Sequence, residues 1–274
     1  MGSAMAANLA KAKFRVQGFD VLPARRAALK RAGGRPVSAI AEIEAPVVIT
    51  SLPSAAALHA VAAEMVSKCV VMETSTLPIE EKERARETLA KKGIVLLDCP
   101  LSGTGAQARA KDLVVYASGD RKAFKKAEPY MPGFSRAHYY LGAFGNGSKM
   151  KFVANLMVAI HNVSAAEAFV LGMKAGLDPK TIFEVAGDGA GTSRMFQVRG
   201  PMMVKGRYGD ATMKCEVWQK DMKIIGEFTM KHGVPTPLFN ASAAVYNAAM
   251  AQGFAQQDTA AVCAVLESMA HIKR

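Results

Sequence analysis

The sequence is poor in cysteine and contains no long apolar run, and both shortages narrow the class of protein. Its four cysteines lie far apart and form no C-x-x-C pair, which favours reduced, mostly buried thiols over a disulfide framework. The longest bare apolar stretches, 45–52 and 93–97, are far too short to cross a bilayer. No segment has the apolar centre of a secretory signal, and position six lacks the serine or threonine of a myristoylation site. A soluble, cytoplasmic protein that makes no use of a membrane is expected.

Metal-ligand spacing and nucleic-acid signatures are also missing. The five histidines are scattered without H-x-x-x-H or H-E-x-x-H, so no metal site is expected. The net charge of +12 fits either nucleic acid or a positive field that attracts anionic cofactors and carboxylates. The basic residues form small clusters interrupted by acids, without interleaved aromatic residues or a zinc-finger or RNP motif. This pattern favours a small anionic ligand over nucleic acid.

The first half of the sequence alternates short apolar runs with helical stretches. The 274 residues are 50% hydrophobic, enough for one large core or two smaller ones. Bare apolar runs are typical of strands covered on both faces, and we predict strands over 14–20, 46–50, 69–73, 93–98 and 113–117. Helices are predicted between them, over 23–31, 55–67, 78–92 and 121–130. This order predicts a mostly parallel, doubly wound α/β sheet of the Rossmann type.

After Gly147 the alternation of predicted strands and helices gives way to helical patterns alone. Residues 148–175 contain no proline and have apolar residues at helical spacing, which predicts one helix of roughly 28 residues and about 40 Å. Gly176 is a stop signal, and Asp178-Pro179 opens the next helix. Further helices are predicted over 215–231 and 238–252. We therefore predict a Rossmann-type domain over 1–147 and an all-helical domain over 148–274, joined by the long helix.

The strongest motif stands at this junction. Residues 142–155 fit G-x-x-G-x-G-x-x-x-K-x-x-x-N, and five such fixed positions recur by chance about once in a million starts. Lys151 and Asn155 are four residues apart and therefore neighbours on one helix face. The positive helix end would disfavour the ammonium form of Lys151, which could then act as a base. Asn155 would hold the lysine or the substrate. The alternative for Lys151 is an ordinary solvated helix face.

A second motif follows a predicted strand. Residues 98–105 read D-C-P-L-S-G-T-G, and a serine hydroxyl with exposed backbone amides in such a loop suits a carboxylate. The alternative is an ordinary turn after a strand.

These motifs resemble the β-hydroxyacid dehydrogenase family, of which 3-hydroxyisobutyrate dehydrogenase is a member. Residues 142–155 match its lysine motif, and 98–105 resemble its D-A-P-V-S-G-G loop. The resemblance implies a domain order like that of 6-phosphogluconate dehydrogenase, catalytic roles for Lys151 and Asn155, and substrate binding by Ser102, Gly103 and Thr104. Thr104 departs from the family, which usually has glycine there, and this puts the substrate's identity in question.

The first dinucleotide-binding motif is incomplete. Met1 to Leu9 matches only the end of the family's G-L-G-x-M-G-x-x-M-A-x-N-L, so Met1 and Gly2 are the implied cofactor contacts. The preceding strand and two glycines are missing from the sequence, which predicts weak cofactor binding and an unpaired strand edge. Taken alone, this segment would be an alanine-rich amphipathic helix.

Other implied cofactor contacts are spread along the chain. Asp20 ends a predicted strand, where a carboxylate binds ribose hydroxyls and repels a 2′-phosphate, so NAD is favoured over NADP. Arg25 and Arg26 could soften that preference, and Asp20 could instead be a turn residue. The family's M-L-P, S-S-T and K-D-L segments are matched at residues 51–53, 74–76 and 220–222, which implies Leu52, Pro53, Thr76 and Lys220. Its late G-F-x-x-x-D resembles Gly253, Phe254 and Asp258, for which helical packing is an equal account.

The resemblance implies an NAD(P)-dependent oxidoreductase acting on the CH–OH group of a small 3-hydroxy acid such as 3-hydroxyisobutyrate or serine, or reducing tartronate semialdehyde. A homodimer or homotetramer is expected. The 6-phosphogluconate dehydrogenases keep a histidine where Ala154 stands, and imine reductases replace the lysine found at 151. The alternative from another class is a catalytically impaired cofactor-binding relative, or a basic nucleic-acid-binding one.

Overall fold

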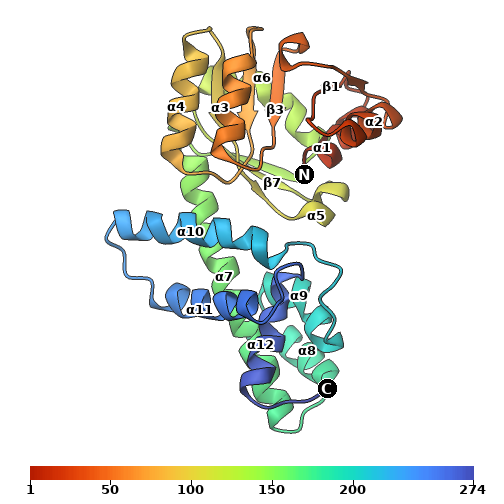
Figure 1. Ribbon diagram of the computed structural model, residues 1–274, viewed down its shortest axis with the longest axis vertical. Coiled ribbons are helices and arrows are strands. Elements are labelled where there is room, and N and C mark those ends of the chain that lie inside the picture. The colour runs from red at the N-terminus through yellow and green to blue at the C-terminus, as the bar shows by residue number, and fades with distance from the viewer. The chain divides into compact units, whose positions relative to one another are not determined.

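The computed structural model describes all residues from 1 to 274. The chain divides into two compact units, Met1–Lys151 and Phe152–Arg274. The long helix α7 (Asn146–Lys174) begins in the first unit and continues into the second (Figure 1). Each unit is described separately below.

The first unit contains all the strands. In chain order they are β1 (Gln17–Gly18), β2 (Arg35–Pro36), β3 (Val47–Thr50), β4 (Val70–Glu73), β5 (Val95–Asp98), β6 (Leu101–Ser102), β7 (Val114–Ala117) and β8 (Ala137–Tyr140). They pair in the orders β1-β2, β3-β4-β5 and β6-β7-β8, and every pair is parallel except β6 with β7. A bridge between Asp98 and Ser118 joins the end of β5 to the end of β7. The mostly parallel α/β prediction is confirmed.

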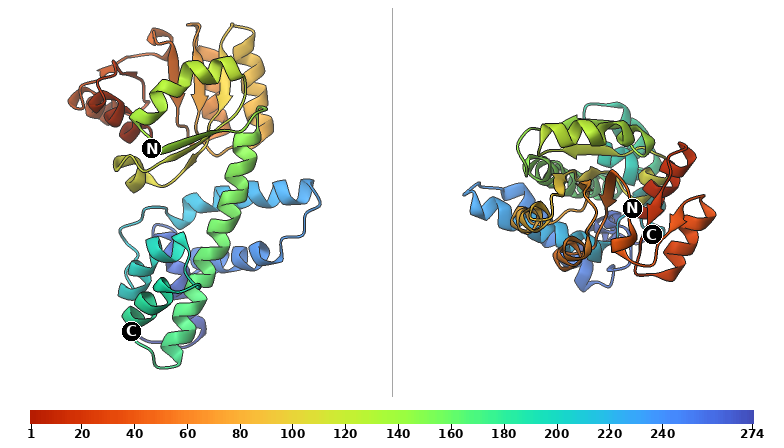
Figure 2. Two further views of the ribbon diagram at one scale, coloured as in Figure 1. Left: turned by 180° about the vertical axis from the view of Figure 1, so that it is seen from behind. Right: turned by 90° about the horizontal axis from the view of Figure 1, so that it is seen from above.

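Helices cover both faces of this strand system. They are α1 (Gly2–Lys11), α2 (Pro23–Arg31), η1 (Ile40–Glu42), α3 (Ala55–Glu64), α4 (Ile79–Ala90), α5 (Gly105–Arg109), α6 (Arg121–Ala127) and η2 (Glu128–Gly133). Helices α3 and α4 lie on one face, and α6 lies on the other (Figures 1 and 2). This is the doubly wound arrangement that the alternating pattern predicts.

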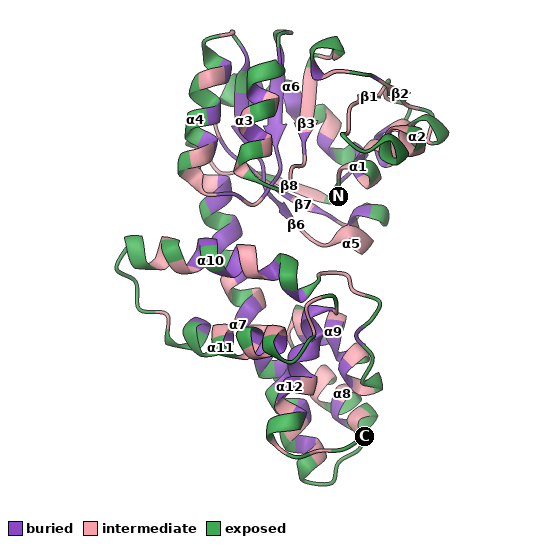
Figure 3. Ribbon diagram, in the orientation of Figure 1, coloured by how far each residue is buried: buried purple, intermediate pink, exposed green.

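The strands bury both faces because alternate residues point to opposite sides. Val70, Met72 and Leu97 belong to the core cluster that includes α1 and α6. Val71 and Leu96 belong to the cluster that includes α3 and α4. All four residues of β4 are buried, as the purple strands of Figure 3 show. The unbroken apolar runs in the sequence therefore have a direct structural cause.

The strand system is open beside β1 and β3. Strand β1 pairs only with β2, and β3 pairs only with β4. The first three residues of β3 are half-buried, whereas those of β4 are fully buried. The predicted unpaired strand edge is thus present. The strand predicted over 14–20 is wrong in length, since regular pairing covers only Gln17–Gly18.

The second unit is helical. After α7 it contains α8 (Pro179–Asp188), α9 (Arg194–Lys205), α10 (Cys215–Lys231), α11 (Pro237–Ala251), η3 (Thr259–Ala261) and α12 (Val262–Met269). Gly176 has φ +90, the left-handed conformation that favours glycine after a helix, and the Asp178 side chain caps α8 by accepting from the Thr181 N–H. The predicted stop and restart are confirmed.

Helix α7 is long and apolar enough to cross a membrane by length and composition alone, although the sequence contains no long unbroken apolar run. The polar side chain of Asn162 has hydrogen-bond partners within the second unit. Asn162 is fully buried and donates to the Tyr246 hydroxyl and to the Thr259 carbonyl, both at 2.9 Å. These two hydrogen bonds satisfy the Asn162 amide N–H groups inside the protein.

The late Asp258 is a structural residue. It is fully buried, its carboxylate lies 3.0 Å from Arg199 Nε, and it accepts from the N–H groups of Thr212, Met213 and Ala260. Burial by itself would raise the pKa of Asp258, but Arg199 and these N–H donors hold that pKa below its usual value. Of the two accounts open from the sequence, packing is the one that these contacts support.

Candidate functional site

Three glycines shape the approach to α7, each for its own reason. Gly142 and Gly145 have φ of +81 and +91, which side-chain-bearing residues rarely adopt. Gly147 is required by space, because a Cβ there would lie 2.3 Å from the Tyr116 carbonyl oxygen and 2.8 Å from that of Asp98. The first turn of α7 therefore rests directly on the backbone of the strand ends, and the motif's glycine spacing is explained by geometry.

Lys151 follows one turn after this close approach. It is only 8% exposed, whereas its helix neighbours Lys149 and Met150 are exposed. Lys151 therefore does not lie on a solvated helix face, which was the alternative account of this residue. A largely buried lysine is uncommon unless its charge or its amine has a specific use.

Asn155 is also buried, with 5% exposure, and it has a specific partner. Its Nδ2 donates to Oδ2 of Asp221 on α10 at 2.9 Å. This bond fixes the orientation of the amide, so the Asn155 Oδ1 is held in a single direction. Asp221 is a residue that sequence reasoning passed over, because the K-D-L match drew attention to its neighbour Lys220. The Lys220 side chain is 39% exposed, and its Nζ lies 3.5 Å from the Asp221 Oδ1.

The predicted substrate loop has the form of a tight turn into a short helix. Ser102 ends β6, and Gly103 has φ +127 with a built Cβ only 2.7 Å from Leu113 Cδ2, so glycine is required. Thr104 stands at the N-cap of α5, where its N–H donates to Gln107 Oε1 at 2.8 Å. The family departure at Thr104 thus has a local structural role at a helix start, where threonine is favoured. All three residues are partly accessible.

The predicted cofactor loops meet at the carboxyl ends of β3 and β4. The Leu52 N–H donates to Ser75 Oγ at 2.7 Å, which joins the loop of Leu52 and Pro53 to the one that contains Thr76. A Cβ built on Gly2 would lie 3.6 Å from that of Ser51, so the start of α1 adjoins the same loop. Dinucleotides bind at this edge in open α/β sheets.

The start of α1 carries a positive field suited to a phosphate group. Burial, followed by the charges of Arg25 and Arg109, lowers the pKa of the Met1 α-amino group below its usual value. Helix α5, which carries Arg109, is tied to α1 by a bond from Asn8 Nδ2 to the Ala108 carbonyl oxygen. A helix N-terminus with backbone N–H groups and adjacent arginines favours an anion. The residues present therefore fit the diphosphate of a dinucleotide.

The Asp20 side chain makes a hydrogen bond within the turn that follows β1. Its Oδ1 accepts from the Leu22 N–H at 2.9 Å, which is the turn interaction considered from the sequence. Arg26 donates to the Asp20 backbone carbonyl rather than to its carboxylate. The second carboxylate oxygen is therefore not committed to the neighbouring arginine.

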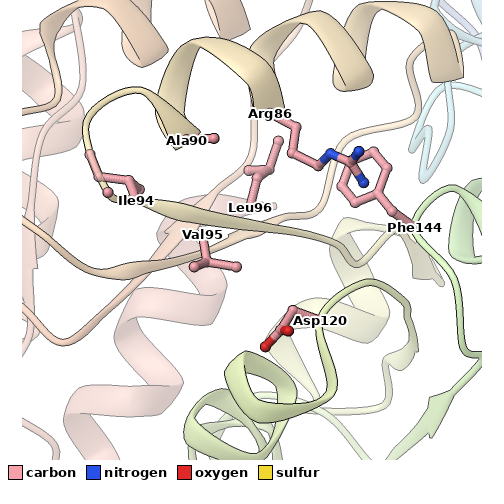
Figure 4. A pocket seen from close by; sticks show the side chains of 8 residues that line it. Arg86, Ala90, Ile94, Val95, Leu96, Asp120 and Phe144 are labelled. Atoms are coloured by element: carbon pink, nitrogen blue, oxygen red, sulfur yellow. The ribbon is translucent and has the colours of Figure 1, made fainter.

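A separate pocket lies away from these loops, beside β5 and α4 (Figure 4). It has a volume of about 310 Å³ and is lined mainly by apolar groups such as Ile94 and Val95. Its two charged groups already have structural roles. The Arg86 guanidinium stacks on the Phe144 ring at 4.7 Å, and Asp120 caps α6. None of the predicted site residues lines this pocket, so it is separate from the candidate site.

The structure of the first unit thus places Gly2 and Leu52 close to each other. It adds Arg25 and Arg109 to the expected cofactor groups. Lys220 and Asn155 share Asp221 as a partner in the second unit. The four cysteines are buried and unpaired, as predicted.

Both units of the chain are similar to known proteins. Residues 1–142 match the family model described as the NAD binding domain of 6-phosphogluconate dehydrogenase, and residues 145–266 match that described as the NAD-binding of NADP-dependent 3-hydroxyisobutyrate dehydrogenase. An L-threonate dehydrogenase of Cupriavidus necator is 31% identical, over 96% of this chain and 91% of that protein. A 3-hydroxyisobutyrate dehydrogenase of Pseudomonas aeruginosa is 33% identical, over 73% of this chain and 70% of that protein.

Solved structures show the same fold. A 3-hydroxyisobutyrate dehydrogenase from Salmonella typhimurium has a TM-score of 0.86 and 25% identity, covering 96% of this chain and 95% of that chain. One from Mycobacterium tuberculosis with L-serine has a TM-score of 0.85 and 26% identity, covering 97% and 95%.

Fold and matches together define a nicotinamide-dependent dehydrogenase that acts on the CH–OH group of hydroxy acids. The chain belongs to the β-hydroxyacid dehydrogenase family. The comparisons give no support to a catalytically impaired or nucleic-acid-binding relative.

Proposed function

We propose that the protein oxidises a short 3-hydroxy acid to its semialdehyde or keto acid, reversibly and with NAD. The observation that carries this proposal is the largely buried Lys151, one helical turn before the buried Asn155 and four residues after the glycine-anchored start of α7. A nicotinamide cofactor held by the loops of Leu52 and Thr76 would supply the acceptor for the hydride of the alcohol carbon. Lys151 takes the alcohol proton in oxidation and returns it in reduction.

The other predicted residues would bind and orient. Asn155, held by Asp221, offers its amide oxygen to the lysine or to the substrate hydroxyl. The Ser102 hydroxyl and the backbone amides of Gly103 and Thr104 would bind the substrate carboxylate. Relatives named for L-threonate, 3-hydroxyisobutyrate and L-serine act on short hydroxy acids, which supports this class.

The direct test is an assay with NAD or NADP against a panel of 3-hydroxy acids, followed by the absorbance of the reduced nicotinamide. We expect turnover with at least one short acid, and a thermal-shift screen of carboxylates should rank the same compound first. No turnover with any acid, together with tight binding of DNA, would reverse the proposal in favour of the nucleic-acid-binding alternative.

The proposed preference for NAD depends on the Asp20 charge, which can be separated from its turn. Asp20→Asn keeps an oxygen for the Leu22 N–H, whereas Asp20→Ala removes both turn and charge. A hydrogen bond to a charged group contributes about 1.5–3 kcal/mol, so we expect KM for NAD to rise roughly 10- to 100-fold in both variants. We also expect discrimination against NADP to fall in both. An unchanged NAD-to-NADP ratio of kcat/KM in Asp20→Asn would show that Asp20 serves the turn alone.

We also propose that the protein forms a homodimer or homotetramer through its second unit. Leu171 of α7 and Met269 of α12 are 73% and 67% exposed, and they line one shallow apolar hollow with Val170 and Leu266. Exposed apolar surface of this kind is typical of subunit contacts. Sedimentation should give a dimer or larger species, and Leu171→Lys should shift it toward monomer. A monomeric wild-type protein at micromolar concentration would contradict this.

A cytoplasmic location is proposed as well. Four buried, unpaired thiols fit a reducing compartment. Cell fractionation should recover the protein with the soluble cytoplasmic enzymes, and recovery in a secreted or membrane fraction would contradict the proposal.

A further inference from the structure

A buried charge network lies beneath the first turn of α7. Lys82 of α4 is fully buried, with its Nζ 2.8 Å from Asp98 Oδ1 and 2.7 Å from Glu73 Oε2. The contact with Glu73 is an ion pair whose geometry falls short of a hydrogen bond. Asp98 and Glu73 are also fully buried, at the carboxyl ends of β5 and β4. Burying three charges away from solvent costs desolvation free energy unless each charge has partners.

On one side, the network holds the start of the helix that carries Lys151. Asp98 Oδ2 accepts from the Ser148 N–H at 2.7 Å, and the Ser148 hydroxyl donates to Asp98 Oδ1 at 2.8 Å. The Ser118 hydroxyl donates to the same carboxylate and accepts from the Gly147 N–H at 2.9 Å. An anion at a helix N-terminus is stabilising, and here the anion comes from a strand fifty residues earlier.

On the other side, the network reaches the cofactor loops. Glu73 Oε1 accepts from the Ser75 N–H at 2.9 Å, and Ser75 Oγ accepts from the Leu52 N–H. A continuous series of hydrogen bonds and ion pairs therefore runs from the loop of Leu52 to the first turn of α7, with Lys82 between Glu73 and Asp98.

The electrostatics require this lysine. Burial by itself would lower the pKa of Lys82, yet Asp98 and Glu73 raise it above its usual value, so Lys82 stays charged. The other titratable group facing the network is the Cys99 thiol, whose pKa is raised by burial and by Asp98. His59 of α3 pairs with Glu81 of α4 rather than with the charges of this network. Without Lys82, two buried carboxylates would share one site with no cation, and one of them would take up a proton.

We infer that Lys82 is a positioning residue for the dehydrogenase reaction: by pairing with Asp98 and Glu73, it holds the start of α7 and the cofactor loops in fixed register. This inference rests on the proposed function for its kinetic consequence, while its structural consequence can be measured without a substrate. It concerns residues that the family motifs do not assign to the site.

The test compares Lys82→Met with the charge-balanced E73Q/K82M, which has the same net buried charge as the wild type. The matched control is Lys91→Met, an exposed lysine at the end of the same helix. In Lys82→Met we expect kcat to fall about 100-fold, the loss that roughly 1 Å of misplacement can cause. We also expect a new loss of kcat at acid pH, since a neutral Asp98 carboxyl accepts from the Ser148 N–H more weakly than a carboxylate does. In E73Q/K82M, kcat should recover to within about tenfold and the acid loss should disappear.

Amide hydrogen exchange provides the readout that is independent of activity. In Lys82→Met the Ser148 amide should lose protection while the amide of Ala159, deeper in α7, keeps it. In E73Q/K82M the Ser148 amide should be protected again. If Lys82→Met does not fold, the double variant decides: a folded double variant with an exchanging Ser148 amide overturns the inference.

A purely structural lysine gives a different pattern. Lys82→Met would then lower the melting temperature but keep the kcat, pH profile and Ser148 protection of the folded wild type, and this result overturns the inference. Failure of the proposed function is distinguishable, because the wild type would then turn over no hydroxy acid while the exchange measurement still decides the role of Lys82.

Discussion

Replacement of Lys151 by alanine is expected to lower kcat by about 10²- to 10⁴-fold, the usual contribution of a positioned acid–base group. Lys151 is largely buried and follows the anchored first turn of α7, so its amine is held in place by the fold. Affinity for NAD should remain nearly intact, because Lys151 is not among the predicted cofactor contacts. Steady-state kinetics and NAD titration measure the two quantities separately.

The control is Lys149→Ala in the same helix. Lys149 is exposed, and its Nζ reaches only Asn146 Oδ1 at 3.2 Å. This change should leave kcat within about a factor of two, since surface substitutions rarely perturb a site. Equal losses of kcat and of NAD affinity in Lys151→Ala would contradict an acid–base role and indicate a general disturbance of α7.

Replacement of Asp258 by alanine is expected to cost about 3–5 kcal/mol of unfolding free energy, the loss typical of breaking a buried ion pair. Arg199, whose side chain is 4% exposed, would keep its charge without its carboxylate partner. The N–H groups of Thr212, Met213 and Ala260 would lose their acceptor as well. Urea denaturation followed by circular dichroism checks the shift in midpoint.

Two further variants serve as controls for the Asp258→Ala measurement. Asp210→Ala, in the exposed loop nearby, should change stability by no more than about 0.5 kcal/mol. The double change Arg199→Met with Asp258→Ala should recover part of the loss, because the unpaired buried charge is removed. A folded Asp258→Ala protein of wild-type stability that fails to turn over substrate would instead give Asp258 a role in the site.

The sign of the pH dependence follows from the lowered pKa of Asp258. The stabilisation is fully present above the unfolded pKa of aspartate, near 3.9, and is lost as the pH falls through the lower folded value. Acid denaturation of the second unit should therefore begin at a higher pH in Asp258→Asn than in the wild type.

Much of the fold could be predicted because the relevant signals are local. Strands β3, β4, β5 and β7 are unbroken apolar runs, and the left-handed Gly176 with the cap at Asp178 marks the turn after α7. The length of β1 could not be predicted, since pairing there ends with its short partner β2. Strand β8 was missed as well, because its A-H-Y-Y sequence carries no clear apolar pattern.

Residues of the candidate site could be predicted only where a suitable side chain stands in a local sequence motif. Lys151 and Asn155 stand in one motif, and both are buried as a site requires. The partners that hold them are distant in sequence: Asp221 lies 66 residues after Asn155, and Asp98 lies 50 residues before Ser148. Lys82 reads as one more charge on a polar helix, and only the fold reveals that it faces Glu73 and Asp98.

We expect the Lys151 amine to transfer the proton, and rescue of Lys151→Ala by a free amine tests this claim most directly. Methylamine or ethylamine added to Lys151→Ala should restore a measurable part of kcat, in proportion to the amount of unprotonated amine. The same amines should leave the wild type and Lys149→Ala unchanged. A Lys151→Ala enzyme that keeps wild-type turnover with no amine added would contradict the claim.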